Sequence, residues 1–503
     1  MQNSELTRDL AALDLGSNSF HLIIVRYEQG QIRIVDRLNE YVRLAAGLDE
    51  NNHIYEEKIL EALDALARIG QRLREIEHRY IRIVGTNTLR KAKNAYSFVR
   101  RAESVLNHPI EIISGKEEAR LIYAGVSSIR ASGDGKHLVI DIGGGSTEFI
   151  IGEANEPICM ESLFMGCVST SERFFAKGKI TRSAMKQAID AASVELMPIV
   201  ENYKRVGWKT VVGSSGSVKA VLKTVQAAGW CKNLITSKGL AKLTRKLIEL
   251  GEITPRNLPG LSEKRMPVFA GGVAVLNACF RDLGIDRMEV SDAALREGVI
   301  QDLIGRRSRQ DVRNGSVSAL AQRYHVDLDQ ADRVKTTALQ LFDAVADEWG
   351  LDPEIHKPLL SWAADLHEIG LDISHHQYHK HGAYVIANTD LPGFSITDRA
   401  ILSTLVRGHR RKLNELVFNP IPDTILKSVE RLVMLLRLSV LIHRDRNPVT
   451  PPEVVVSVQK KKIRLRIDEA WQQEHPLTLT QIEEENSLIG ARGFSVTVLS
   501  DNL

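Results

Sequence analysis

The sequence predicts an α/β protein with two similar halves that face each other across a cleft, followed by an all-helical region and a small unit with β-strands. Two glycine-containing turns, at residues 10–19 and 138–149, follow apolar runs and share the same layout. Strand signals disappear after residue 316 and return only after residue 454. We therefore expect several compact units, since one hydrophobic core rarely serves a chain of 503 residues.

The second turn, LVIDIGGGSTEF at residues 138–149, is the clearest candidate for a functional site. Its apolar run predicts a buried strand that ends beside Asp141. Gly143, Gly144 and Gly145 lack the Cβ atoms that would keep backbone N–H groups from converging on an anion. Taken alone, the stretch is equally consistent with a phosphate-binding turn and with an ordinary tight turn.

The first turn, LAALDLGSNS at residues 10–19, repeats this design. Asp14 ends an apolar run and is followed by Gly16, Ser17 and Asn18, with the same Asp-x-Gly spacing. Asp14 precedes Asp141 by 127 positions. A repeated strand, acid and small-residue turn favours two related half-domains whose phosphate-binding turns face each other.

Composition restricts the classes of partner and the location. Lys and Arg number 66 against 63 Asp and Glu, and the resulting net charge of +3 does not indicate a nucleic-acid-binding protein. The four cysteines form no CxxC pair, which is typical of buried thiols in a reducing compartment. The N-terminus is polar and Arg437 interrupts the most apolar later run, so we expect a cytoplasmic protein without an integral membrane segment.

Periodicity predicts the elements of the first half. Strands are expected at residues 20–27, 31–37, 81–84 and 109–113, with a helix over residues 55–80. The segment GTNTLRKA at residues 85–92 carries Arg90 where a strand ends and a helix begins. It is either an anion-binding turn or a plain capped helix. The next helix carries Glu117 and Glu118, which point about 100° apart, so at most one faces a given site.

The second half repeats strand, turn and helix. Its expected elements are a hairpin at residues 150–162, helices at 183–203, 258–283 and 292–303, and strands at 209–212 and 287–290. The turn GSSGS at residues 213–217 is either a third phosphate contact or a connecting loop. A polar, basic connector at residues 305–314 predicts a domain boundary.

The pattern of apolar residues changes twice in the last third of the sequence. Helical periods dominate from residue 316 to about 444, which predicts an all-helical domain. Three prolines, at positions 448, 451 and 452, then interrupt the pattern. Strands are expected at residues 454–458, 463–467 and 494–499.

Several motifs, taken together and in order, resemble the exopolyphosphatase and guanosine pentaphosphate phosphatase family. They are DLGSNSFH at 14–21, GTNTLR at 85–90, ISGKEEARLIYAGV at 113–126, DIGGGSTE at 141–148, MGCVS at 165–169, ALREGV at 294–299, LHEIGLDI at 366–373 and DLPGF at 390–394. The resemblance implies two duplicated actin-like (ribonuclease H-like) lobes, an HD-like helical domain and a small C-terminal β-containing domain. The expected boundaries are 1–125, 126–308, 309–445 and 446–503. It also implies a homodimer and Mg²⁺-dependent hydrolysis of terminal phosphates.

Phosphates and carboxylates in one cleft repel each other unless a cation lies between them. Mg²⁺ suits this place, and Asp14 and Asp141 at the two strand ends are the expected metal residues. A monovalent cation such as K⁺ is a second candidate cofactor. The phosphate oxygens need donors from backbone, hydroxyl and guanidinium groups. The expected phosphate-binding residues are Gly16, Ser17, Asn18, Arg90, Gly143, Gly144, Gly145 and Ser146.

Hydrolysis also needs a carboxylate that orients or deprotonates water. The resemblance assigns this role to the second glutamate of EEAR, which is Glu118. Its neighbour Glu117 is expected to be solvated. Glu148, just after the second glycine turn, is the second catalytic candidate, for positioning the water or the metal.

The helical region is rich in histidine. Seven of the 15 histidines lie within 54 positions, between His356 and His409. An HD hydrolase needs a His-Asp pair, whereas His367 is followed by Glu368, which argues against a catalytic metal there. A polyanion-contacting surface and ordinary packing are the other two interpretations. Basic runs at residues 407–412 and 460–466 are either a path for a polyanion or solvated faces.

Three functions follow from these patterns. The first is a processive exopolyphosphatase that hydrolyses inorganic polyphosphate with Mg²⁺ and a water activated by glutamate. The alternative is a guanosine pentaphosphate phosphohydrolase that uses the same cleft and yields guanosine tetraphosphate. A sensor of phosphate or nucleotide without catalysis is the third, since the same fold also serves other classes. The stretch SDAALREG at residues 291–298 and the overall run of motifs resemble the polyphosphatase branch slightly more, and the sequence reveals no guanine pocket.

Overall fold

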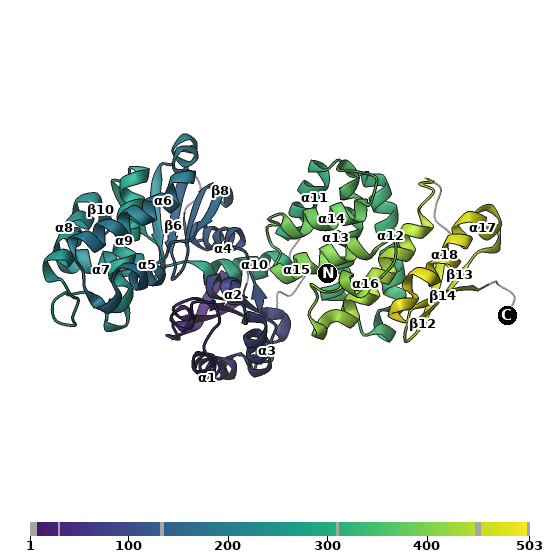
Figure 1. Cartoon of the computed structure of the whole chain (residues 1–503), viewed down its shortest axis with the longest axis horizontal. Coiled ribbons are helices and arrows are strands. Elements are labelled where there is room, and N and C mark those ends of the chain that lie inside the picture. The colour runs from purple at the N-terminus through teal and green to yellow at the C-terminus, as the bar shows by residue number, and fades with distance from the viewer. Residues whose placement is uncertain (1–7, 29–30, 131–134, 308–310, 448–453, 500–503) are drawn as a thin grey trace. The chain divides into compact units, whose positions relative to one another are not determined.

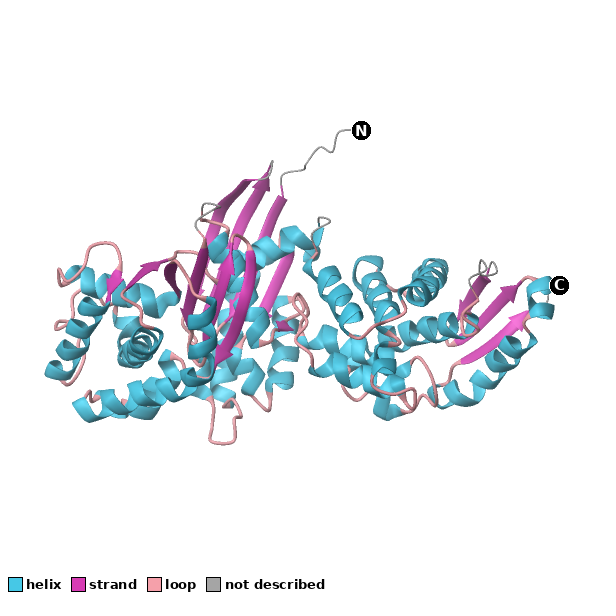
Figure 2. Ribbon diagram, turned by 90° about the horizontal axis from the view of Figure 1, so that it is seen from above, coloured by secondary structure: helices cyan, strands magenta, loops and turns pink. Residues whose placement is uncertain are grey.

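The structure is a computed structural model, and it describes residues 8–28, 31–130, 135–307, 311–447 and 454–499 (Figure 1). The chain forms two compact units, Met1–Asp311 and Val312–Leu503. The prolines at positions 448, 451 and 452, and part of the predicted connector, lie outside the described residues. Figure 2 shows that strands are concentrated in the first unit and at the C-terminal end of the second.

The first lobe is built on a five-stranded sheet in the order β3-β2-β1-β4-β5. Its central strand pairs antiparallel with β2 and parallel with β4. Apolar side chains cover both faces of that strand, so it is buried from Leu10 to Leu13. The strands are β1 Arg8–Leu15, β2 Phe20–Glu28, β3 Gln31–Glu40, β4 Ile81–Gly85 and β5 Glu111–Ile112.

The second lobe repeats this topology. Its six-stranded sheet has the order β10-β11-β9-β6-β7-β8, in which β6 pairs antiparallel with β7 and parallel with β9. The strands β6 to β9 and β11 therefore correspond to β1 to β5, and the predicted duplication of actin-like lobes is confirmed. They are β6 Lys136–Ile142, β7 Thr147–Glu153, β8 Glu156–Leu163, β9 Thr210–Ser214, β10 Ile235–Thr236 and β11 Arg287–Val290.

The helices of this unit cover the sheets with apolar faces. In α1, buried Ile59, Leu66 and Ile69 recur at helical spacing and face the first sheet's core. The helices are α1 Glu56–Leu73, α2 Asn87–Lys91, α3 Ala95–Leu106, α4 Gly115–Ser127, α5 Cys167–Phe174, α6 Arg182–Val206, α7 Ser215–Ala227, α8 Ser237–Leu250, α9 Met266–Leu283 and α10 Leu295–Arg307.

Two of these helices, α4 and α10, join the lobes. Helix α4 packs on β7 and β8 of the second lobe, whereas α10 packs on β1 and β2 of the first. The helices touch each other through glycines: a Cβ on Gly298 would lie 1.7 Å from the carbonyl oxygen of Leu121, and one on Gly125 would lie 2.2 Å from that of Ala294. The close backbone contact fixes α4, which carries Glu118, relative to both sheets.

The most apolar helix belongs to the core of the second lobe. Residues Glu263–Leu283 are long and apolar enough to cross a membrane by length and composition, but 72% of the apolar window is buried inside the fold. Helix α9 in this segment packs against α5 and α6. Its apolarity is therefore that of a core helix.

The second unit is helical and ends in a small sheet, as predicted. A parallel pair, β13 and β14, completes the order β12-β13-β14, and two helices lie between these strands in sequence. Sequence analysis missed both helices. The elements are α11 Val312–Arg323, α12 Leu328–Trp349, α13 Pro353–Leu366, α14 Tyr378–Asn388, α15 Ile396–Gly408, α16 Asp423–Ile442, β12 Val454–Gln459, β13 Lys462–Ile467, α17 Glu469–Glu474, α18 Pro476–Ile489 and β14 Ser495–Leu499.

Candidate active site

The two glycine turns meet in one cavity of about 450 Å³ in the first unit. A Cβ on Gly144 would lie only 2.7 Å from the Cβ of Ser17, so the turns touch, and both line the cavity. Five predicted phosphate-binding residues line it besides Gly144: Gly16, Ser17, Asn18, Gly143 and Ser146. The prediction that the turns face each other is correct, and their phosphate contacts remain predictions.

The second turn is held by the start of helix α5. The backbone N–H groups of Cys167 and Val168 donate to the carbonyl oxygens of Gly143 and Gly144, at 2.9 and 2.8 Å. A Cβ on Gly166 would lie 2.3 Å from the Gly144 oxygen, which explains the glycine in MGCVS. Within the turn, the N–H of Gly143 donates to the carbonyl oxygen of Ser146 at 2.9 Å, so the turn is closed on itself and held by the helix through its carbonyls.

Asp14 and Asp141 reach the cavity from the ends of β1 and β6, and Glu118 reaches it from α4. Burial, with the negative charge of Glu118 nearby, raises the pKa of Asp14 to about 8 and that of Asp141 to about 6. Asp14 Oδ1 is buried without a hydrogen-bond partner. Three carboxylates are thus concentrated where a cation would relieve their repulsion.

These residues fit Mg²⁺. Their donors are carboxylate oxygens, and the orphaned oxygen of Asp14 lacks only a donor or a cation. No group of three or more His, Cys, Asp or Glu side chains in the described part of the chain is placed to bind a metal by itself. Mg²⁺ usually binds one or two protein carboxylates and completes its coordination shell with water and phosphate oxygens.

Glu118 is paired with Arg90. The guanidinium Nη1 of Arg90 donates to Glu118 Oε2 at 2.8 Å and to the carbonyl oxygen of Ile113 at 2.9 Å. Arg90 is not among the residues that line the cavity, and its expected phosphate contact stays a prediction. Its guanidinium pairs with Glu118 and can orient that carboxylate.

Two further predicted site residues, Glu148 and Gly145, are not among those that line the cavity. Glu148 is only 1% exposed and accepts a hydrogen bond from Ser162 Oγ at 2.9 Å, while its Oε2 is buried without a hydrogen-bond partner. Burial and the nearby charges of Glu118 and Asp141 raise its pKa well above the ordinary value. A Cβ on Gly145 would lie 2.5 Å from Oδ1 of Asn87, which itself lines the cavity. The roles of both positions stay predictions.

Four cations that sequence analysis missed line the same cavity: Lys219, Lys223, Arg265 and Arg296. The two lysines lie one helical turn apart on α7, just after the GSSGS turn. The guanidinium of Arg265 lies against Gly216, where a Cβ would be 1.7 Å away. In the sequence, the one signal for these cations was the i, i+4 spacing of Lys219 and Lys223 after a small-residue turn. The cavity is therefore lined by cations as well as by carboxylates, and Arg296 lies near enough to Asp14, and Lys219 and Arg265 to Asp141, to lower their pKa values.

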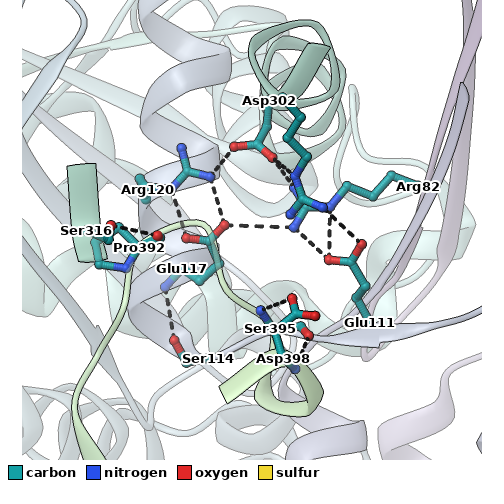
Figure 3. A network of polar contacts seen from close by, with 11 residues as sticks. Arg82, Glu111, Ser114, Glu117, Arg120, Asp302, Ser316, Pro392, Ser395 and Asp398 are labelled. Carbon is teal, nitrogen blue, oxygen red and sulfur yellow. Dashed lines mark hydrogen bonds and ion pairs between the residues drawn. The ribbon is translucent and has the colours of Figure 1, made fainter. Parts of the chain in front are cut away.

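Glu117 was expected to be solvated, and this was wrong. It is 2% exposed, and both its oxygens accept hydrogen bonds from Arg120 at 2.8 Å (Figure 3). Asp302 on α10 accepts from Arg120 and, at 2.7 Å, from Arg82 on β4. Arg82 and Arg120, from two different elements, turn inward, so the acid beside them is buried with them.

Replacing Gly144 by alanine is expected to lower the rate of phosphate release at least tenfold. The new methyl group would push the turns apart at Ser17, and a misplacement of about 1 Å near reacting atoms costs up to roughly 100-fold. Phosphate release and the unfolding temperature would be measured together. Gly315→Ala is the control, since a Cβ there meets nothing within 4 Å. An unchanged rate for Gly144→Ala would contradict the close packing of the turns.

The histidines of the second unit divide into two groups. His367 and His409 are buried, and their Nδ1 atoms lie 2.7 and 2.6 Å from the carbonyl oxygens of Ala364 and Val406, as in ordinary helix-end packing. His375 and His376 instead line a cavity of about 370 Å³ together with Lys380, Arg410 and Arg411. A polyanion contact at this cavity stays a prediction. In the other basic run, Arg464 and Arg466 lie on the exposed face of β13.

The second unit is expected to lose stability as the pH falls below about 6.5. Burial lowers the pKa of both His367 and His409, so both are neutral in the folded protein while the unfolded chain binds protons. Their contribution is complete above the ordinary pKa and is lost on acidification, about 1 kcal/mol per histidine at pH 5.5. Hydrogen exchange of α13 and α15 in the whole protein should be faster at pH 5.5 than at 7.5, after correction for intrinsic exchange. Equal protection would contradict this.

The duplicated actin-like fold gathers two glycine turns, carboxylates and cations in one cavity, an arrangement that suits a phosphorylated ligand. The chain belongs to the Ppx/GppA phosphatase family: the model of that family matches residues 23–307, and that of Ppx/GppA phosphatase domain III matches residues 312–486.

Relatives and solved structures agree with this membership. The chain is 38% identical to "Guanosine-5'-triphosphate,3'-diphosphate pyrophosphatase" of Aeromonas hydrophila, over 96% of this chain and 97% of that protein. Its identity to the protein of the same name from Vibrio vulnificus is also 38%, over 94% and 95%. An exopolyphosphatase structure from Cytophaga hutchinsonii has a TM-score of 0.54 at 24% identity, covering 59% of this chain and 98% of that one. At that identity the likeness concerns the fold.

Proposed function

We propose that this protein hydrolyses the 5′-terminal phosphate of guanosine 5′-triphosphate 3′-diphosphate, giving orthophosphate and guanosine tetraphosphate. One observation carries the choice of substrate. The curated relatives that match nearly the whole chain at 37–38% identity share a name that specifies this nucleotide. The sequence motifs placed the polyphosphatase slightly ahead, and these relatives favour the alternative.

The proposed reaction is the attack of water on the terminal phosphorus. As the new P–O bond forms, the bond from that phosphorus to the bridging oxygen breaks, and the diphosphate oxygen leaves with the electron pair. Glu118 accepts the proton that the water loses, and its hydrogen bond from Arg90 fixes the carboxylate. Asp14 and Asp141 would hold Mg²⁺, which when bound neutralises charge on the phosphate oxygens.

The two turns position the phosphates in this proposal. Backbone N–H groups at Gly16 to Asn18 and Gly144 to Ser146 would donate to phosphate oxygens, with the hydroxyls of Ser17 and Ser146, whereas the N–H of Gly143 is bonded to the Ser146 oxygen. The cations Lys219, Lys223, Arg265 and Arg296 would hold the phosphates that do not react. Because these cations also suit a condensed phosphate chain, inorganic polyphosphate remains the second candidate substrate.

Phosphate release with Mg²⁺ and with EDTA tests the proposal. Guanosine pentaphosphate, long polyphosphate and ATP would be compared at equal concentration of terminal phosphate. We expect the pentaphosphate to have the highest kcat/KM and EDTA to abolish release. A higher kcat/KM for polyphosphate would assign the protein to the second candidate, and no release from either would overturn both.

The remaining expectations concern the setting of the enzyme. We propose that it acts as a homodimer in the cytoplasm and that a monovalent cation such as K⁺ assists catalysis. Light scattering on the purified protein tests the dimer. Rates in K⁺ and in a large organic cation at equal ionic strength test the cation.

A further inference from the structure

A second cavity of about 420 Å³ adjoins the cleft, and nothing in the catalytic scheme uses it. Asn18 of the first glycine turn lines both cavities. The second cavity has mainly apolar walls, which include Val168 and Phe175 from the α5 region and Met266 and Val268 from α9. Val168 also packs 3.4 Å from the position of a Cβ on Gly144. The cavity therefore begins directly beside the turns that would hold the phosphates.

The side chain of Asn18, which lines both cavities, makes no hydrogen bond. It is only 7% exposed, yet neither its Oδ1 nor its Nδ2 has a hydrogen-bond partner. Its backbone oxygen is occupied, since it accepts from the N–H of Arg43 at 2.8 Å. A buried amide without partners costs free energy unless a ligand completes its hydrogen bonds. Its position indicates a ligand that extends from one cavity into the other.

The second cavity has fewer cations in its walls than the cleft has. Glu172 and Glu252 line it, and neither carboxylate has an ion-pair partner among the side chains that the structure describes. Apolar walls with two carboxylates repel a polyphosphate chain. They suit a flat ring with apolar faces and an edge of N–H donors.

Arg43 also lines the second cavity. Its backbone is left-handed, with φ of 53°, and its side chain is exposed. The hydrogen bond from its N–H to Asn18 explains why a residue other than glycine is held in this conformation. The guanidinium thus stays beside the opening and can bind an anion outside the apolar walls.

We propose that the second cavity holds the guanine base of the substrate, with the N1–H and N2–H₂ edge of the base donating to Glu172 and Glu252 while the 5′-phosphates occupy the cleft. This inference rests on the proposed function. Asn18 bonds the ribose or the adjoining phosphate, and Arg43 meets the 3′-diphosphate. Adenine offers no donor at N1 or at position 2, so the same carboxylates disfavour it.

The test uses the whole protein and three substrates: guanosine pentaphosphate, its adenosine counterpart and tripolyphosphate. The double variant Glu172→Gln/Glu252→Gln keeps the size of both side chains and removes both charges. We expect it to lower kcat/KM for guanosine pentaphosphate at least tenfold, since hydrogen bonds to charged acceptors are the stronger kind. The preference for guanosine over adenosine should fall by the same factor, and hydrolysis of tripolyphosphate should stay within twofold of the wild type.

Glu195→Gln, an exposed position on α6, is the matched control and should change none of these values. An unchanged kcat/KM of the double variant for guanosine pentaphosphate overturns the base site and leaves the proposed function standing. An equal loss for all three substrates also overturns it, since the carboxylates would then affect the cleft as a whole. If the wild-type protein fails to hydrolyse guanosine pentaphosphate, the proposed function itself is wrong. Hydrolysis of tripolyphosphate by the same wild-type protein shows whether the cleft is active, so this failure is distinct from failure of the base site.

Discussion

Replacement of Glu118 by glutamine is expected to lower kcat at least about 100-fold, with little change in the unfolding temperature. The amide keeps the size of the side chain, and its oxygen can still accept the hydrogen bond that Arg90 donates at 2.8 Å. It cannot take a proton from water. Because the residue lines the cavity rather than a packed core, the fold loses no essential contact.

Single-turnover phosphate release, with binding of the substrate measured separately, distinguishes a slower chemical step from weaker binding. We expect the dissociation constant to change less than about fivefold while the chemical step slows by two orders of magnitude. Glu118→Asp should recover part of the rate, since it restores a carboxylate. A variant Glu118→Gln with full activity would remove Glu118 as the base.

The features that sequence predicted are those that neighbouring residues determine. Apolar runs gave the strands, and the two Asp-x-Gly turns gave the pair of facing loops, because both depend on residues adjacent in the chain. None of Gly143, Gly144 and Gly145 has a positive φ, and Gly144 lies against Ser17, so at Gly144 the missing Cβ serves the close approach of the two turns. The convergence of N–H groups on an anion stays a prediction. The C-terminal helices α17 and α18 have no clear apolar period: α17 buries none of its residues, and Thr478 and Glu485, two of the four buried residues of α18, are polar.

The features that sequence could not predict depend on distant partners. Arg265 and Arg296 reach the cleft from α9's start and from α10, far from either glycine turn in sequence. Glu117 was predicted to be solvated because the groups buried with it are distant in the sequence. Arg82 lies on another element, and Asp302, which binds the Arg120 that also binds Glu117, is 182 positions from Arg120. In each case tertiary packing, not local pattern, sets the role of the charge. The catalytic roles of Glu118 and Glu148 stay predictions.

Replacing Glu117, the neighbour of the proposed base Glu118, is expected to affect the stability of the fold more than the rate. Glu117→Gln is expected to lower the free energy of unfolding by about 3 kcal/mol or more, because it leaves buried arginine charge uncompensated. Glu117 accepts two hydrogen bonds from Arg120 at 2.8 Å and lies 3.9 Å from Arg82 (Figure 3). The side chains of Glu117 and Arg82 are each only 1% exposed, so water cannot replace the lost charge.

Thermal or denaturant unfolding of the whole protein measures this effect, followed through probes in the first unit. The double variant Glu117→Gln/Arg120→Gln removes both charges, and its cost should fall short of the sum of the single costs by at least about 1 kcal/mol. Since α4 also carries Glu118, the rate of any folded Glu117→Gln protein should drop less than that of Glu118→Gln. If Glu117→Gln unfolds like the wild type, the buried network does not stabilise α4, and some other contact, such as that between Gly125 and α10, holds the helix in place.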